Sequence, residues 1–344
     1  MDSQNSVSSS DPAEHLVGAV PDLTDLLAEL RAGCPLPIVL SPHGRLADDW
    51  LPGWLRRCGV PPDGSAYRRL AGARIGGYAA RLYPTASPAR LRLLTALFAW
   101  FFMLDDEFDG VADPRQERLH RLAAEILALL RAEQPRTAQP GVVFVGPARR
   151  MLVGPWWVLD RSMPRWWRER FTDAVVEHLT GALREAANKA SGHRPDPAEY
   201  VGLRRATSAA NVAYTLIEVA TGDPVPDAVF HHPRVREVAD AGNDLLSWYN
   251  DLYSLRGDLL VGGGHNLVVA VADAGRMPIP EAVAEVARRW RTRLGLFVRC
   301  RAAVPSFGPA HDQAARALLD GIGNTVRGTI DWSAETSRYR PDQM

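Results

Sequence analysis

Residues 93–109 read LLTALFAWFFMLDDEFD, an apolar run that ends in four acidic residues within five positions. No glycine or proline interrupts the run, so it predicts one buried helix. Positions i, i+1 and i+4 share a helix face, so Asp105, Asp106 and Asp109 would project together from the end of a buried rod. Carboxylates held so close cost several kcal/mol through desolvation and mutual repulsion unless a cation compensates them. Mg2+ prefers such oxygen ligands, and the run therefore predicts a metal site.

The alternative for these acids is a solvated helix end. Phe101 and Phe102 stand in the preceding turn, and they favour the mouth of a cavity instead. They precede Asp105 by four and three residues, which places them on the same face, about 5–6 Å deeper along the helix axis. For the two rings themselves, core packing and a place in the cavity wall are both open.

The composition excludes several classes of protein. The 344-residue chain is 46% hydrophobic and 23% charged, which is ordinary for a globular protein. Its 40 basic and 40 acidic residues give a formal net charge of zero and no basic block stands out, which argues against a nucleic-acid partner. The three cysteines are widely spaced and form no metal-binding pattern, which favours a reducing cytoplasm.

The N-terminal segment is not expected to be a signal peptide. Its first twelve residues are polar and rich in serine, without the basic and apolar regions of a signal peptide. Residues 1–30 are expected to be disordered for the same reason. The longest apolar run, residues 93–104, is shorter than the roughly 20 residues that a helix needs to span a bilayer. The sequence thus predicts a cytoplasmic protein without a membrane span.

Helical patterns account for most of the remaining chain. Ser87-Pro88 and Asp113-Pro114 each combine an N-cap residue with a proline at the first helical position. Residues 35–52 are expected to be irregular, and only residues 142–145 could form a short strand. The expected fold class is all-α, with a single domain over residues 31–344. The expected helices cover residues 66–82, 89–109, 114–132, 149–189 with interruptions at 154–155 and 163–164, 197–222, 233–260, 265–275, 279–303 and 309–331.

The acidic segment 105–109 resembles the aspartate-rich DDxxD motif of class I terpene synthases. Enzymes that elongate prenyl chains carry this motif too, so the second half of the chain has to decide between the two. Residues 243–258 read NDLLSWYNDLYSLRGD. They resemble the second metal motif of terpene synthases, Asn-Asp-(Leu/Ile/Val)-x-(Ser/Thr)-x-x-x-Glu. The elongating enzymes have another DDxxD motif in its place, and none occurs here.

The second motif fits this sequence twice, seven residues apart. In either register its ligands at i, i+4 and i+8 form one oxygen-rich stripe along a helix. Family members commonly follow the motif with a Gly-containing turn and then His-Asn-Leu-Val, which stands here at residues 265–268. That offset selects the second register. The first stripe is Asn243, Ser247 and Asp251; the second stripe, expected to bind metal, is Asn250, Ser254 and Asp258.

The end of the second stripe departs from the family pattern. Asp258 replaces the family's Glu, which leaves open whether it binds the metal directly or through water. Gly257 stands where the family often has a Lys that touches the diphosphate, and Arg256 is expected to take over that contact.

The resemblance also implies a set of diphosphate contacts. Arg204 lies 46 residues before Asn250 (250 − 204), the family's usual separation for its diphosphate-sensing Arg. A planar guanidinium suits a pair of diphosphate oxygens, and the neighbouring Arg205 is the better candidate for a surface residue. Thr207 and Ser208 stand where the family bends this helix, usually with Gly in the second place.

A last contact is expected at the C-terminal end. Arg338-Tyr339 resembles the family's closing Arg-Tyr pair, whose guanidinium and phenol hydroxyl bind the diphosphate. The rings of Phe101 and Phe102 would face the carbocation that forms when the diphosphate leaves.

Taken over residues 35–340, the chain is similar to bacterial class I terpene cyclases, with residues 31–344 as the catalytic domain. The resemblance implies a lyase that ionises a linear prenyl diphosphate and cyclises the carbocation. It implies three Mg2+ ions, and catalytic roles for Asp105, Arg204, Arg338 and Tyr339. By family frequency the expected substrate is farnesyl diphosphate and the product a sesquiterpene, with geranyl and geranylgeranyl diphosphate as alternatives. A homodimer is left open.

Two other functions remain possible at this stage. One is a prenyl-chain-elongating transferase, which the missing second DDxxD motif disfavours. The other is a non-catalytic relative that binds diphosphate, for which Ser208, Gly257 and Asp258 would be the signs. Release of diphosphate in the presence of Mg2+ would separate this second alternative from an enzyme.

Overall fold

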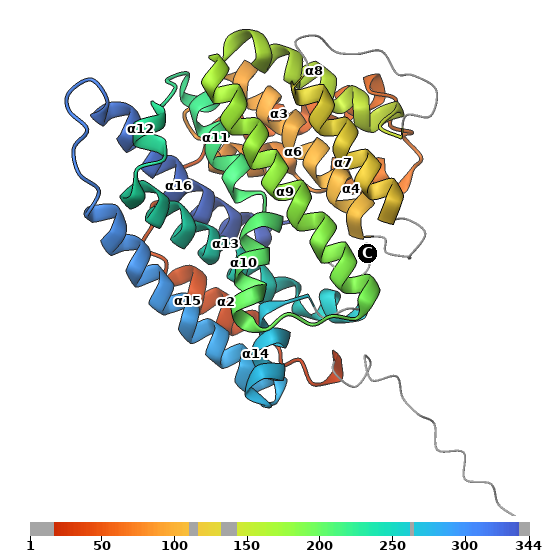
Figure 1. The fold of residues 1–344 in the computed structure, drawn as a ribbon, viewed down its shortest axis with the longest axis vertical. Helices are drawn as coiled ribbons and strands as arrows, with labels where there is room; N and C mark the ends of the chain where they lie inside the picture. Colours follow the sequence, from red (N-terminus) through yellow and green to blue (C-terminus); the bar gives the residue numbers. More distant parts are fainter. Residues whose placement is uncertain (1–16, 110–115, 132–142, 262–264, 337–344) are drawn as a thin grey trace, which may run out of the picture.

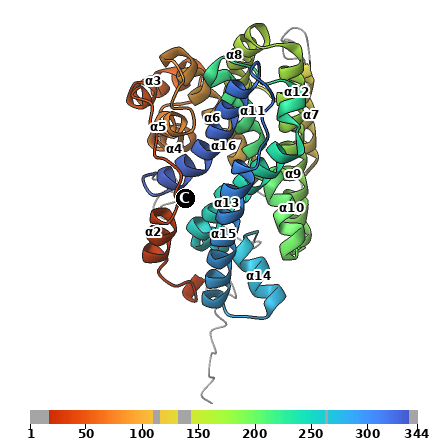
Figure 2. The same cartoon turned by 90° about the vertical axis from the view of Figure 1, so that its left-hand side faces the viewer.

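The computed structural model describes residues 17–109, 116–131, 143–261 and 265–336. Every regular element within these ranges is a helix, which confirms the predicted all-α class (Figures 1 and 2). The helices are α2 Thr24–Ala32, α3 Gly44–Arg57, α4 Ser65–Gly72, α5 Ile75–Leu82, α6 Pro88–Asp109, α7 Gln116–Arg131, α8 Gly146–Ser162, α9 Arg165–Ser191, α10 Pro197–Thr207, α11 Ala210–Thr221, α12 Asp227–Phe230, α13 Pro233–Val261, α14 Leu267–Gly275, α15 Ile279–Ala302 and α16 Asp312–Ser333.

The helices that carry the sequence motifs lie inside the bundle. α6 is surrounded by α3, α5, α8 and α11, and its Leu94, Leu97 and Trp100 are at most 1% exposed. A helix that is apolar on all sides can only be stable in such a position, as the sequence predicts for residues 93–104. α13 packs between α15 and α16, with α15 on the outside of the molecule (Figures 1 and 2). Among the helices of the described ranges, none combines the length and the hydropathy that a membrane-spanning segment requires.

The N-terminal region differs from the sequence expectation. Residues 1–16 lie outside the described ranges, but α2 lies within the segment expected to be disordered, and its Leu30 is 1% exposed. The prediction of irregular structure for residues 35–52 is wrong from residue 44 onward, where α3 begins. Asp48 of α3 accepts a hydrogen bond from the backbone N–H of Gly76 at 2.7 Å, at the start of α5. This capping contact comes from a residue distant in sequence, so local punctuation could not reveal it.

The breaks between helices differ from the prediction at two places, one break that was not predicted and one predicted break that is absent. The helix expected over residues 66–82 is broken at Arg74, whose φ of 54° lies in the left-handed region. The Ala73 carbonyl there accepts hydrogen bonds from the side chains of Trp332 and Thr336 at the end of the chain's last helix and just beyond it. The interruption predicted at 154–155 is wrong, because α8 runs through it, whereas the one at 163–164 is confirmed between α8 and α9.

The possible strand at residues 142–145 is not found in its described part. Residues 143–145 form no strand, and residue 142 lies outside the described ranges. The other predicted helices are present close to their expected bounds, apart from a break in the helix predicted over residues 197–222, which belongs to the site.

Candidate functional site

The end of α6 places Asp105 and Asp106 in one region, as the sequence predicts. Asp105 Oδ1 lies 3.8 Å from Nε2 of His178 on α9. The imidazole is 3% exposed, and its burial lowers the pKa of His178, so the ring is neutral at pH 7. Asp106 Oδ2 pairs with Arg69 Nη2 of α4 at 2.9 Å. Sequence reasoning missed His178 and Arg69, because nothing in the local pattern links either residue to α6.

The other two acids of the motif have different fates. Glu107 pairs with Arg118 of α7 at 2.9 Å, so it is engaged by a neighbouring helix. This fits its position at i+2 from Asp105, which points away from the face that the aspartates share. The backbone of Asp109 ends α6, but its side chain lies outside the described part of the structure.

Phe101 and Phe102 enter different surroundings. Phe101 is 5% exposed and packs edge-on against Trp100 and His178. Phe102 is half-buried and stacks on Trp332 of α16, with ring centroids 5.6 Å apart and planes inclined by 9°. Trp332 in turn stacks on Tyr78 of α5 at 4.4 Å. Tyr78 and Phe102 also stack on each other at 6.1 Å, so Phe102, Trp332 and Tyr78 form an aromatic cluster from three helices, while Phe101 belongs to the core.

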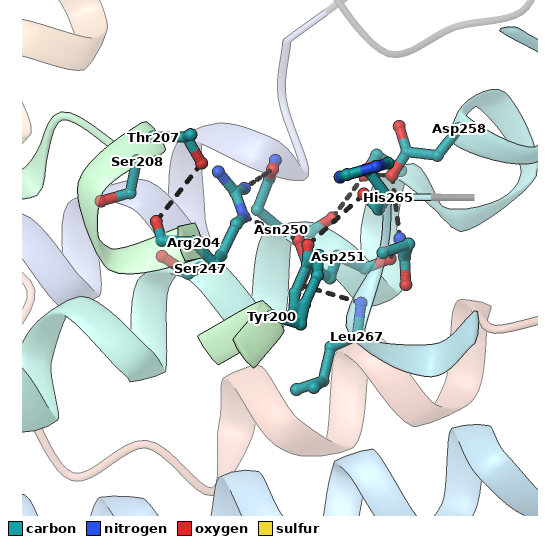
Figure 3. Close-up of polar contacts among 12 residues, drawn as sticks. Tyr200, Arg204, Thr207, Ser208, Ser247, Asn250, Asp251, Asp258, His265 and Leu267 are labelled. Atoms are coloured by element: carbon teal, nitrogen blue, oxygen red, sulfur yellow. Dashed lines mark hydrogen bonds and ion pairs between the residues drawn. The ribbon is translucent and has the colours of Figure 1, made fainter. Parts of the chain in front are cut away.

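The second stripe of α13 forms a connected polar cluster (Figure 3). The Ser254 hydroxyl lies 2.8 Å from Asp258 Oδ2 and 2.9 Å from the Asn250 carbonyl, and it can donate to either. Asn266, at the start of α14, donates from Nδ2 to Asp258 Oδ2 at 2.8 Å. Burial nevertheless raises the pKa of Asp258 to about 6, because the ionised carboxylate is poorly solvated there.

Arg204 joins this cluster from α10. Its Nη2 donates to Asn250 Oδ1 at 2.7 Å and its Nε donates to Asp251 Oδ1 at 3.0 Å (Figure 3). Tyr200, one turn earlier on α10, donates its hydroxyl to Asp251 Oδ2 at 2.9 Å. Burial alone would lower the pKa of Arg204, but Asp251 beside it raises that pKa overall, so the guanidinium remains charged. The spacing argument therefore identified a residue that does reach the second stripe.

The two registers on α13 differ in their accessibility. Asn243, Ser247 and Asp251 of the first stripe are each at most 2% exposed, and hydrogen bonds within the protein engage all three. The three residues of the second stripe are only partly buried. A ligand from outside the protein could therefore reach the second stripe more readily than the first.

α10 ends at Thr207 and α11 begins at Ala210, so the single helix predicted over residues 197–222 is wrong at this point. Ala209 carries the break with a φ of 56°, in the left-handed region that costs a residue with a Cβ about 1–2 kcal/mol. Such strain persists only where the surrounding structure imposes it, and it often marks a functional position. The break lies beside Ser208, where the family resemblance implies a bend.

Arg205 is not the free surface residue that the sequence suggested. Its guanidinium makes two hydrogen bonds to Asp244 of α13, at 2.7 and 2.8 Å, and the Asp244 side chain is fully buried. Arg293 of α15 reaches the same carboxylate at 3.1 Å. This ion pair fastens the last turn of α10 to α13 and α15.

Among the remaining predicted diphosphate contacts, Arg256 does not join the cluster. It is exposed and donates from Nη2 to the Val20 carbonyl at 3.3 Å, so it is bonded to the N-terminal segment. Arg338 and Tyr339 lie outside the described ranges. Thr207 places its hydroxyl 3.5 Å from the Arg204 carbonyl, next to the helix break.

The donor atoms fit a hard divalent cation. Carboxylate, amide and hydroxyl oxygens are the ligands that Mg2+ takes, and both α6 and α13 supply them. Burial disfavours the ionised form of the Asp258 carboxylate. A cation that compensates its charge would therefore stabilise that form. Within the described ranges, no group of three His, Cys, Asp or Glu side chains is close enough to hold a metal by itself. A metal bound here would therefore rely on Asn and Ser ligands, on Asp109 or on the substrate.

The chain is similar to several known proteins. The profile described as "Terpene synthase family 2, C-terminal metal binding" matches residues 96–294. The chain is 32% identical to a 10-epi-cubebol synthase from Sorangium cellulosum, over 90% of this chain and 98% of the relative. It is 28% identical to a (+)-T-muurolol synthase described as (2E,6E)-farnesyl diphosphate cyclizing, from Roseiflexus castenholzii, over 89% of this chain and 92% of the relative.

A solved structure of a terpene synthase is similar to this chain over most of its length. Germacradien-4-ol synthase from Streptomyces citricolor superimposes with a TM-score of 0.75 at 27% identity, over 88% of this chain and 97% of that one. Further similar chains come from fungi, among them one named sesquiterpene synthase 1 from Postia placenta, which is 26% identical over 91% of this chain and 90% of the relative.

Proposed function

This chain belongs to terpene synthase family 2, and on that premise we propose that it is a sesquiterpene cyclase that acts on farnesyl diphosphate. Membership makes it a terpene cyclase, a lyase that acts on prenyl diphosphates and uses a divalent metal. The choice of farnesyl diphosphate is supported by the relative from Roseiflexus castenholzii, which is described as (2E,6E)-farnesyl diphosphate cyclizing. The sesquiterpene synthases among the fungal relatives support the same choice. Geranyl and geranylgeranyl diphosphate are the alternatives that the experiment below tests.

The metal-binding residues are proposed on both sides of the site. Three Mg2+ ions would be held by the α6 acids and by the second stripe of α13. When bound, Mg2+ supplies positive charge to the leaving diphosphate. The proposed ligands are Asp105, Asp106 and Asp109 on α6 and Asn250, Ser254 and Asp258 on α13.

One observation carries the proposal furthest, namely the contact of Arg204 with both Asn250 and Asp251. The contact places a permanent cation beside the proposed metal stripe, where a diphosphate would need a donor. Asp251 orients the guanidinium through Nε, and Tyr200 in turn donates to Asp251, so that Nη2 could exchange Asn250 for a diphosphate oxygen. Arg338 and Tyr339 are proposed, from the family resemblance, to add contacts from the C-terminal end.

The apolar side of the site would protect the cation that forms. The half-buried Phe102 presents a ring that Trp332 and Tyr78 hold in place by stacking. Aromatic faces attract cations. The cluster of these three rings would also exclude water from the space beside it. We therefore assign the carbocation contact to Phe102 and leave Phe101 in the core.

The experiment is incubation of the purified protein with geranyl, farnesyl and geranylgeranyl diphosphate, each with and without Mg2+. Released diphosphate and the extracted hydrocarbons are measured, the latter by gas chromatography with mass detection. We expect cyclic fifteen-carbon products from farnesyl diphosphate only with Mg2+. A longer prenyl diphosphate formed after addition of isopentenyl diphosphate would establish an elongating enzyme, and binding without diphosphate release would establish a non-catalytic relative. The bacterial origin, the cytoplasmic location and a homodimer stay predictions.

A further inference from the structure

The first stripe of α13 has no place in the proposed metal site. The side chain of its first residue, Asn243, is nevertheless engaged by several hydrogen bonds. Asn243 is 2% exposed and lies beneath the break between α10 and α11. Its Nδ2 donates to the Arg205 carbonyl at 2.8 Å, and its Oδ1 lies 2.8 Å from the Ser208 hydroxyl. Ser247 donates to the same Oδ1 at 3.0 Å. The amide of Asn243 therefore grips the end of α10 on both its donor and its acceptor side.

These contacts satisfy groups that the break would otherwise leave unpaired. The last carbonyls of a helix have no partner within the helix, and Arg205 is in the last turn of α10. Asn243 Nδ2 supplies one partner at 2.8 Å, and the Ser208 hydroxyl lies 3.1 Å from the same carbonyl. The Ser208 oxygen in turn accepts a hydrogen bond from the backbone N–H of Ala210 at 3.1 Å, at the start of α11. Asn243 and Ser208 together thus close both ends of the break around the strained Ala209.

We propose that Asn243 is a positioning residue that, through Ser208, sets the conformation of the helix break and thereby the aim of Arg204. The proposal rests on the proposed function for its effect on turnover. It gives the duplicated motif two roles, with the first stripe holding the break and the second stripe binding metal. Figure 3 shows Thr207 and Ser208 next to Arg204, on the side of α13 that carries Asn250.

The proposal also explains the departure at Ser208. A glycine there would leave the backbone free to bend but could not reach Asn243. Serine instead reaches Asn243 with its hydroxyl, which fixes one conformation of the bend. The two residues should therefore act as one unit, and removal of either should have the effect of removing both.

Loss of this contact should displace the break without unfolding the protein. The ion pair of Arg205 with Asp244 still fastens the last turn of α10, and Arg293 supports Asp244 from α15. The expected effects are therefore a changed product mixture and a lower kcat/KM, with a folded protein.

The test is a double-mutant cycle with Ser208→Ala, Asn243→Ala and the double variant. We expect each single variant to lower kcat/KM about tenfold and the double variant to lower it about tenfold as well, because the pair acts as a unit. All three should give more acyclic alcohol, which forms when water captures the cation early. Ser208→Thr, which keeps the hydroxyl, should restore the product mixture. Asn211→Ala is the matched control, since Asn211 lies near the break but pairs with the exposed Glu177.

A second readout does not depend on turnover. Mg2+ with inorganic diphosphate should still raise the melting temperature of Asn243→Ala, by less than in the unchanged protein because Arg204 is displaced, and by the same amount as in Ser208→Ala. Complete loss of this shift in Asn243→Ala but not in Ser208→Ala would place Asn243 in the metal site and overturn the proposal. Independent effects, with about a hundredfold loss in the double variant, would overturn it too.

Failure of the proposed function would look different. The unchanged protein would then turn over no prenyl diphosphate, while the cycle measured on melting temperature would still show whether the two side chains are coupled. If Asn243→Ala does not fold, Ser208→Ala carries the test, because Ser208 is only partly buried and its hydroxyl is the other half of the contact. An unchanged product mixture from a folded Ser208→Ala variant would refute the positioning role.

Discussion

The proposed site has two sides, the end of α6 and the second stripe of α13. They differ in the contacts that hold their polar side chains. On α13, Asn250 accepts from Arg204, and Asp258 accepts from Asn266. On α6, the Asp105 side chain is 41% exposed and its contact to the neutral His178 spans 3.8 Å. The α13 side is thus organised by hydrogen bonds between helices, whereas on the α6 side Asp105 is more exposed and Asp106 is held by its salt bridge to Arg69.

The largest effect is expected on the organised side. Asn250→Ala should lower kcat/KM about 1000-fold, because it removes both a proposed metal ligand and the acceptor that aims Arg204. Steady-state kinetics over a range of Mg2+ concentrations would measure this loss. Near-normal activity of Asn250→Ala, with an inactive Asn243→Ala, would instead assign the metal to the first stripe.

A smaller loss is expected on the α6 side. Asp105→Asn should lower kcat about 100-fold, since the variant keeps the shape but loses the charge that a cation needs. Glu107→Gln is the matched control, because Glu107 pairs with Arg118 and should cost less than about twofold. Removal of divalent metal with EDTA should abolish turnover of both variants. Similar small losses from the two substitutions would show that α6 binds no metal.

The sequence placed these two motifs on helices correctly because each lies on one uninterrupted helix. The run before Asp105 has no breaker, so local periodicity was enough for α6, whereas the 46-residue separation that pointed to Arg204 came from the family resemblance. Residues 105–109 and the stripe at 250–258 needed no tertiary information to be placed on helix faces.

The parts that the sequence could not predict depend on contacts between distant segments. The break at Ala209 follows no Pro, and its support comes from Asn243, more than thirty residues later in the chain. α9 also approaches closely there, because a Cβ at Gly181 would lie 2.7 Å from the Cβ of Ala206. His178 of α9 lies between the two helices, with one ring nitrogen 3.4 Å from the Ala206 carbonyl of α10 and the other 3.8 Å from Asp105 of α6. The mistaken loop at residues 44–52 has a similar cause, since α3 is fixed by its contact with α5.

Substitutions at Phe101 and Phe102 would show which of the two rings contacts the carbocation and which belongs to the core. Phe102→Leu should change the proportions of the products, because it removes the half-buried ring that stacks on Trp332 and is proposed to contact the carbocation. Phe101→Leu should lower the free energy of unfolding by about 1–2 kcal/mol with little change in products, because Phe101 is in the core. Product analysis and thermal unfolding of both variants would decide, and the reverse pattern would exchange their roles.

The smallest effect is expected from Arg69, the arginine that pairs with Asp106. Both side chains are partly exposed, at 37% and 26%, so this salt bridge should contribute less than about 1 kcal/mol to stability. Arg69→Gln should therefore lower the melting temperature only slightly in the absence of metal. If the α6 acids rely on bound cations, Mg2+ with inorganic diphosphate should remove this deficit, because the cations take over the compensation of Asp106. Arg118→Gln, which loses the pair with Glu107 outside the proposed site, is the matched control, and its deficit should persist. A deficit that persists equally in both variants would mean that bound cations do not compensate Asp106.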